Sequence, residues 1–138
     1  MCFLGVDIGG TSVRSLVTDA GGKILGYQRI ARVSHESLWQ AINDCLGTVL
    51  AQSSVVHVEA AVVGAAGAGP TGNHDVCQSV EKALGAVGLD VTPQVVTDIE
   101  IAYWSAAAFG DGSILVAGTG AIAGRFSEWR CVDRRDGA

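Results

Sequence analysis

The first segment with residue types suited to chemistry lies near the N-terminus, where Asp7 ends an apolar run and Gly9, Gly10, Thr11 and Ser12 follow. Two glycines permit positive φ and let backbone N–H groups approach an anion without a Cβ in the way. Thr11 and Ser12 add hydroxyl donors, and Asp7 can hold Mg²⁺ directly or through water. We interpret the segment as a phosphate and metal site. A plain β-hairpin with a glycine turn would use the same residues and remains the alternative.

Asp98 is the second candidate for chemistry. It follows a predicted strand, residues 94–97, and precedes an alanine-rich predicted helix, residues 99–109. Its carboxylate would then project from the edge of a sheet, where it could accept a proton from a substrate hydroxyl and orient the oxygen for attack on a phosphoryl group. Asp is also common at helix starts, where it binds free backbone N–H groups. From the local sequence, both the general base and the helix cap remain open.

A third segment repeats the design of the first. A predicted strand, residues 113–117, leads into Gly118-Thr119-Gly120, and another apolar run continues to Phe126. This turn could hold a second face of the phosphates. A further loop rich in Ala and Gly, residues 65–70, follows the predicted strand 59–64. Ligands of α/β proteins gather at the carboxyl ends of such strands.

The elements that must position these segments follow from the apolar pattern. Alternation predicts three antiparallel strands over residues 2–8, 13–18 and 23–30. Apolar residues at helical spacing predict one helix that begins near Leu38 and a second helix over residues 74–87. We therefore expect an α/β lobe with a mixed sheet of five or more strands. It should begin as an antiparallel meander, continue with parallel strands, and carry helices on both faces.

Composition narrows the class of protein. The chain has 138 residues, of which 49% are hydrophobic and 17% charged, as expected for one globular domain with an ample core. A net charge of -5 argues against nucleic-acid binding, and the Arg residues after residue 124 are predicted to form a solvated basic tail. Four scattered cysteines indicate neither zinc nor an iron–sulfur cluster. Without a signal-peptide pattern or a membrane-length apolar run, we expect a cytoplasmic protein that does not bind membranes.

The combination of motifs resembles a known superfamily. D-I-G-G-T-S near the start, T-D before a predicted helix and A-G-T-G after it resemble the acetate and sugar kinase, heat-shock ATPase and actin superfamily. Within it, the chain is most similar to the N-acetylglucosamine kinase and BadF/BadG/BcrA/BcrD ATPase group. The resemblance implies a ribonuclease H-like N-terminal lobe over residues 1–138, with ATP and Mg²⁺ as cofactors and nucleotide and an amino sugar as ligands.

The resemblance also assigns roles to single residues. Asp98 corresponds to the catalytic aspartate, and Asp7 lies in the magnesium neighbourhood. The two phosphate loops correspond to Gly9, Gly10, Thr11 and Ser12, and to Gly118, Thr119 and Gly120. The start of the amino-sugar contacts corresponds to Gly67, Ala68 and Gly69.

Three function classes remain open. The first is the catalytic half of an amino-sugar kinase. The second is a BadF-type ATPase whose hydrolysis moves a partner protein, and the third is a non-catalytic remnant that only self-associates. Because the family's C-terminal lobe with its adenosine site is absent from the sequence, we expect weak nucleotide binding, poor turnover and a homodimer that covers exposed apolar surface.

Overall fold

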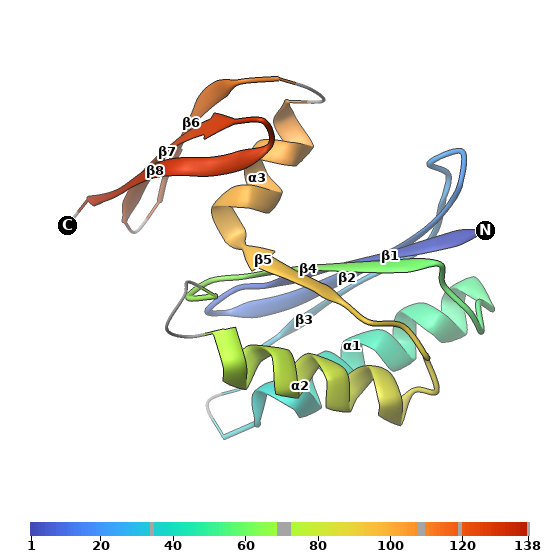
Figure 1. Cartoon of the computed structure of the whole chain (residues 1–138). Coiled ribbons are helices and arrows are strands. Elements are labelled where there is room, and N and C mark those ends of the chain that lie inside the picture. The colour runs from blue at the N-terminus through green and yellow to red at the C-terminus, as the bar shows by residue number, and fades with distance from the viewer. Residues whose placement is uncertain (34, 69–72, 108–109, 119, 138) are drawn as a thin grey trace.

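The computed structural model describes residues 1–33, 35–68, 73–107, 110–118 and 120–137. Over these residues the chain forms three helices and eight strands in two sheets. Figure 1 shows the larger sheet between a layer of two helices below it and a third helix above it, and this third helix carries the smaller sheet. None of the described helices is long and apolar enough to cross a membrane.

The larger sheet has the spatial order β3-β2-β1-β4-β5. Its β1 pairs antiparallel with β2 and parallel with β4, and β4 pairs parallel with β5. This is the mixed sheet expected from the sequence, with the meander first and the parallel strands added afterwards. Its strands are β1 (Cys2–Ile8), β2 (Ser12–Asp19), β3 (Ile24–Ala31), β4 (Ala60–Ala65) and β5 (Gln94–Thr97).

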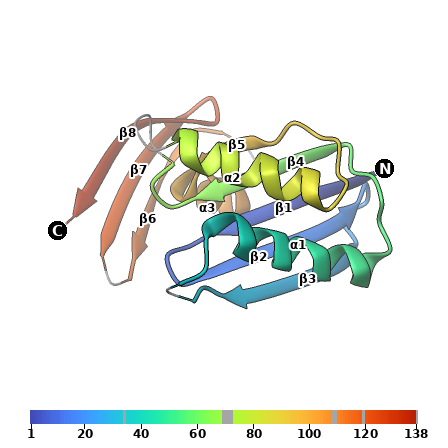
Figure 2. The same cartoon turned by 90° about the horizontal axis from the view of Figure 1, so that it is seen from below.

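Two helices cover one face of this sheet, as Figure 2 shows from below: α1 (Leu38–Ser53) and α2 (Asn73–Ala86). The predicted apolar stripe of α1 is confirmed, since Ile42, Leu46 and Val49 are fully buried in the core between the helices and the sheet. Burial of such side chains contributes about 1.5–3 kcal/mol each. This shared core therefore holds the two helices against the sheet.

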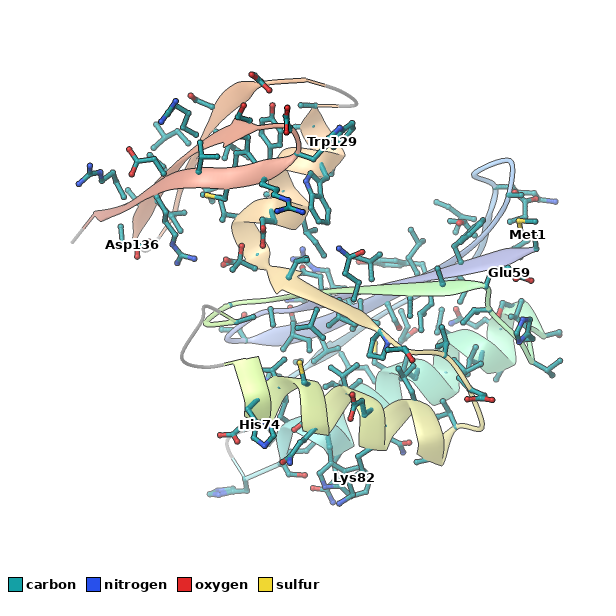
Figure 3. All side chains as sticks on the ribbon, viewed as in Figure 1. Met1, Glu59, His74, Lys82, Trp129 and Asp136 are labelled. Carbon is teal, nitrogen blue, oxygen red and sulfur yellow. The ribbon has the colours of Figure 1, made fainter. Side chains whose placement is uncertain are left out.

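The third helix, α3 (Asp98–Ala106), lies on the opposite face, so helices cover both faces as predicted. It carries the smaller sheet, in which β6 (Gly112–Ala117), β7 (Ala121–Ser127) and β8 (Arg130–Gly137) are antiparallel neighbours. The Tyr103 ring of α3 stacks on Phe126 with centroids 4.0 Å apart. Figure 3 shows Trp129 beside the helix, where its carbonyl accepts a hydrogen bond of 2.9 Å from Trp104 Nε1.

Two expectations differ from the fold. The arginines after residue 124 are exposed, as predicted, but they do not form a loose tail, because Arg125 lies in β7 and the others lie in β8, which pairs along β7. The hairpin between them turns through Glu128 and Trp129, whose φ angles of 49° and 71° are left-handed. The predicted helix over residues 99–109 ends earlier, at Ala106, and residues 108 and 109 lie outside the described part of the chain.

Candidate functional site

The candidate residues meet at one edge of the larger sheet. Strands β1, β4 and β5 run parallel, so their carboxyl ends lie at the same edge. The register aligns Ile8 with Ala65 and Ala65 with Thr97. Since neighbouring strands lie about 4.8 Å apart, the backbones at the ends of β1 and β5 are roughly 10 Å apart. One small ligand can therefore reach both the glycine turn and Asp98.

The glycine turn joins β1 to β2. Its Gly9 N–H donates a hydrogen bond of 2.9 Å to the Ser12 carbonyl. Neither Gly9 nor Gly10 has a positive φ, although other glycines of the chain do. The left-handed backbone that two glycines permit is therefore not used in this turn. The surroundings of Gly10 are open, because no heavy atom lies within 4 Å of the position that a Cβ would take. A ligand can approach the backbone there.

The two hydroxyls after the glycines differ in access. Thr11 is exposed beside the turn, whereas Ser12 begins β2 and is only 7% exposed. Of the predicted hydroxyl pair, Thr11 is therefore the one placed to contact a ligand without rearrangement.

Asp7 faces the side of the sheet that carries α3. Its Oδ2 lies 3.5 Å from Arg14 Nη1, and its side chain is 39% exposed. Among the described residues, no group of three or more His, Cys, Asp or Glu side chains could hold a metal ion. A magnesium ion held chiefly by phosphates and water needs only one or two carboxylates, so a single accessible Asp7 fits such an ion. The metal role of Asp7 remains a prediction.

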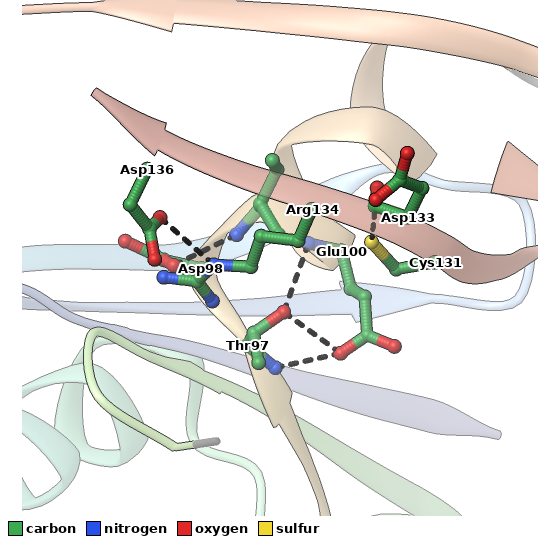
Figure 4. Close-up of polar contacts among 8 residues, drawn as sticks. Thr97, Asp98, Glu100, Cys131, Asp133, Arg134 and Asp136 are labelled. Carbon is green, nitrogen blue, oxygen red and sulfur yellow. Dashed lines mark hydrogen bonds and ion pairs between the residues drawn. The ribbon is translucent and has the colours of Figure 1, made fainter. Parts of the chain in front are cut away.

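Asp98 is the first residue of α3, and the helix is capped by its neighbours. Thr97 is the N-cap, and its Oγ1 accepts a hydrogen bond of 3.4 Å from Glu100 N–H. Glu100 Oε2 accepts bonds from Thr97 N–H at 2.8 Å and from Thr97 Oγ1 at 2.9 Å. Figure 4 shows this reciprocal pair with Asp98 beside it. Asp98 Oδ1 accepts a hydrogen bond of 2.9 Å from Ile99 N–H. Asp98 is therefore not the N-cap residue, and its half-buried carboxylate keeps one oxygen free of the bonds drawn.

The other predicted loops are described in part. Across the turn between β6 and β7, Gly118 N–H donates a hydrogen bond of 2.8 Å to the Gly120 carbonyl. Thr119 lies outside the described residues. In the loop after β4, Gly67 has a φ of 79°, and Ala68 is buried. Gly69 lies outside the described residues. Residues 65–68 are all Ala or Gly, so this part of the loop offers a ligand only backbone groups.

Arg32 is a residue at this edge that the sequence interpretation missed. Its Nη1 donates a hydrogen bond of 3.2 Å to the Gly9 carbonyl, and its backbone N–H donates 2.8 Å to the Thr11 carbonyl. The signal was present in the topology: β3 is antiparallel to β2 and therefore ends at the same edge as β1. A charged residue directly after β3 then had to lie beside the glycine turn.

The chain was compared with protein-family models, curated proteins and solved structures. No protein-family model matches the sequence, and no curated protein matches it. Among solved structures, the chain is similar to a ROK family glucokinase from Streptomyces griseus solved with glucose and AMPPNP, with 27% identity and a TM-score of 0.66. It is also similar to a candidate N-acetylglucosamine kinase from Porphyromonas gingivalis, with 18% identity and a TM-score of 0.71. The fold is that of the N-terminal half of sugar kinases.

These matches cover nearly all of this chain but only part of each related protein. They cover 100% and 96% of this chain but 48% and 47% of the two kinases, so the chain spans about half of their length. The ethanolamine utilization protein EutJ from Carboxydothermus hydrogenoformans matches as well, at 15% identity and a TM-score of 0.67 over 99% of this chain and 51% of its own. The fold is therefore shared by proteins whose names indicate different roles.

Proposed function

We propose that this chain supplies the phosphate-binding and catalytic half of an ATP-dependent sugar kinase that acts on an amino sugar. The observation that carries the proposal is the register row Ile8–Ala65–Thr97, which brings the glycine turn and Asp98 to one edge of the sheet. The similarity to the glucokinase solved with glucose and AMPPNP supports a nucleotide and a sugar as ligands. The amino group of the sugar rests on the motifs and on the similarity to the Porphyromonas gingivalis protein.

In this proposal each group at the edge has one task. The backbone N–H groups at Gly9 and Gly10 and the Thr11 hydroxyl orient the terminal phosphates. Asp98 accepts the proton of a sugar hydroxyl as the oxygen attacks the γ-phosphorus, and ADP leaves. Magnesium, near Asp7, offsets phosphate charge when it is bound. Gly118 and Gly120 hold the second face of the phosphates.

A specific observation favours a second candidate, an ATPase of the BadF type that phosphorylates no sugar. The described part of the predicted sugar loop, residues 65–68, presents no polar side chain. Sugar recognition usually relies on polar side chains placed around the hydroxyls. The two candidates differ in one measurable respect: a kinase forms ADP only when sugar is present, whereas the ATPase forms ADP without it.

The test is ADP formation from MgATP by residues 1–138 joined to a matching C-terminal half, with glucosamine, N-acetylglucosamine, glucose or no sugar. We expect sugar-dependent ADP and a phosphorylated amino sugar. Asp98→Asn should lower turnover at least about a hundredfold with little change in nucleotide affinity, because a general base is removed. Asp90→Asn removes an exposed carboxylate from the loop before β5 and serves as the matched control. ADP formation that ignores sugar would favour the ATPase, and equal turnover in the Asp98 variant would remove its role as base.

A further inference from the structure

A hollow lies beside the glycine turn, on the side away from Asp98. Its volume is about 290 Å³, and it is lined by Gly10, Thr11, Arg32, Val33 and Glu36. Arg32 does not extend freely into solvent there, because its Nη1 donates to the Gly9 carbonyl at 3.2 Å and its backbone to the Thr11 carbonyl at 2.8 Å. The guanidinium is thus held against the backbone that the proposed function assigns to phosphate.

Within the described part of the chain, Arg32 has no carboxylate at ion-pair distance, although its charge attracts that of Glu36. The ion pairs found within the described ranges do not include Arg32, whereas Arg14, the other arginine close to the turn, pairs with Asp7 at 3.5 Å. Glu36 also lines the hollow, and its carboxylate has an acidic neighbour, Asp44. The chain has a net charge of -5, so an anion needs a local positive charge to bind. A guanidinium held next to accessible backbone can provide that charge.

We infer that Arg32 binds an oxygen of a phosphate group lodged over Gly10 and Thr11. A guanidinium has five N–H donors, and the bond to Gly9 uses one of them, so a fork remains for phosphate. Arg32 reaches the turn from the β3 side and Asp98 lies on the β5 side, so the oxygen bound by Arg32 is one turned away from the reacting hydroxyl. The inference rests on the proposed function for its ligand, a phosphate of a nucleotide or of a sugar phosphate.

A structural role for Arg32 makes a different prediction. If the side chain only fastens the turn through Gly9, its removal lowers the stability of the chain and loosens the turn, and no contact with the ligand is lost. If phosphate is bound in the hollow, Glu36 repels it, because Glu36 lines the same hollow. Removing the Glu36 charge then tightens phosphate binding while Arg32 stays in place.

The experiment is an NMR titration of ¹⁵N-labelled chain with inorganic phosphate, MgAMPPNP and glucose 6-phosphate, which separates the sources of the phosphate. Arg32→Met should weaken binding about tenfold or more, the loss typical of a charge-assisted bond. Arg29→Met removes an equal charge from the exposed part of β3 and should leave affinity unchanged. Glu36→Gln should tighten binding up to about threefold, and Arg32→Lys should fall between wild type and Arg32→Met.

Wild-type affinity in Arg32→Met, or equal losses in Arg32→Met and Arg29→Met, would overturn the inference. If Arg32→Met does not fold, an unchanged affinity in Glu36→Gln overturns it by itself. Failure of the proposed function looks different: phosphate binding that depends on Arg32 in a chain without sugar-dependent ADP formation refutes the kinase and leaves the phosphate site standing.

Discussion

At the scale of single residues, the capping of α3 is divided among three side chains. Thr97 and Glu100 form the reciprocal capping box, whereas Asp98 accepts a hydrogen bond from Ile99 N–H, a further free backbone donor of the first turn. The general base proposed for Asp98 therefore requires its second carboxylate oxygen. Its only described bond, to Ile99 N–H, fixes its direction without occupying both oxygens.

This division predicts how stability responds to substitution. Thr97→Ala should lower the free energy of unfolding by about 1 kcal/mol, since it removes the N-cap hydroxyl and the partner of Glu100. Thr97→Ser keeps the hydroxyl and should cost much less. Urea unfolding followed by circular dichroism measures both. Equal losses in the two variants would show that the threonine methyl, and not the cap, stabilises this junction.

Glu36 gives a prediction that depends on pH. Burial raises the pKa of Glu36, the Asp44 carboxyl raises it further, and Arg32 lowers it in part. Because the folded chain disfavours ionised Glu36, its contribution to stability is full below the ordinary value of 4.5 and is lost as the pH rises through the raised pKa. Glu36→Gln should therefore raise the melting temperature at pH 7 and have no such effect near pH 4. A variant that is destabilised at pH 7 would contradict this charge assignment.

At the scale of elements, apolar periodicity predicted the meander, α1, α2 and β4 because each of them buries one face in a single core. It did not predict a second sheet. The core of that sheet is small, with Ile99, Tyr103 and Phe126 buried, and β8 is rich in arginine and aspartate and shows no regular alternation of apolar and polar residues. Likewise, Asp7, the glycine turn and Asp98 could be read from their types, but Arg32 depends on where β3 ends, and the split between Thr97 and Asp98 depends on cap geometry.

The contact of α3 with the larger sheet can be tested at Gly64. A Cβ at this position would lie 2.7 Å from Ile101 Cγ1, closer than real side chains pack. Gly64→Ala should cost about 2 kcal/mol through overpacking. Ile101→Ala should recover part of that loss in the double variant, as expected for residues in contact. Additive losses in urea unfolding would show that α3 does not rest on β4 through this pair.

At the scale of the whole molecule, the smaller sheet leaves apolar surface uncovered. Leu115 is 71% exposed, Val116 40% and Val132 50%, although they lie in regular strands. Exposed apolar side chains grouped on one sheet favour association with another surface. The homodimer expected from the sequence therefore stays a prediction.

Sedimentation velocity over a range of concentrations tests it. We expect a dimer for the 138-residue chain and a shift toward monomer for Leu115→Lys, because a charge in place of the exposed Leu115 side chain must be desolvated on association. Val56→Lys, at an 87% exposed position between α1 and β4, is the matched control. A strict monomer at all concentrations would contradict the expectation.

Nucleotide affinity belongs to the same scale. The chain spans about half of the kinases that it resembles, and the candidate residues proposed in it contact only the phosphates of a nucleotide. We expect calorimetric titration with MgAMPPNP to give a dissociation constant no better than roughly millimolar, since the cost of immobilising the ligand is unchanged. Micromolar binding would show that the phosphate contacts alone suffice.

The placement of α3 between the two sheets has a mechanical consequence. Ile101 rests on Gly64 of the larger sheet, while Ile99, two residues earlier, packs against Gly124 of the smaller one. The first turn of α3 is thus in contact with both sheets, and Asp98 is the first residue of that turn. A displacement of the smaller sheet relative to the larger one would therefore be transmitted to the backbone next to Asp98.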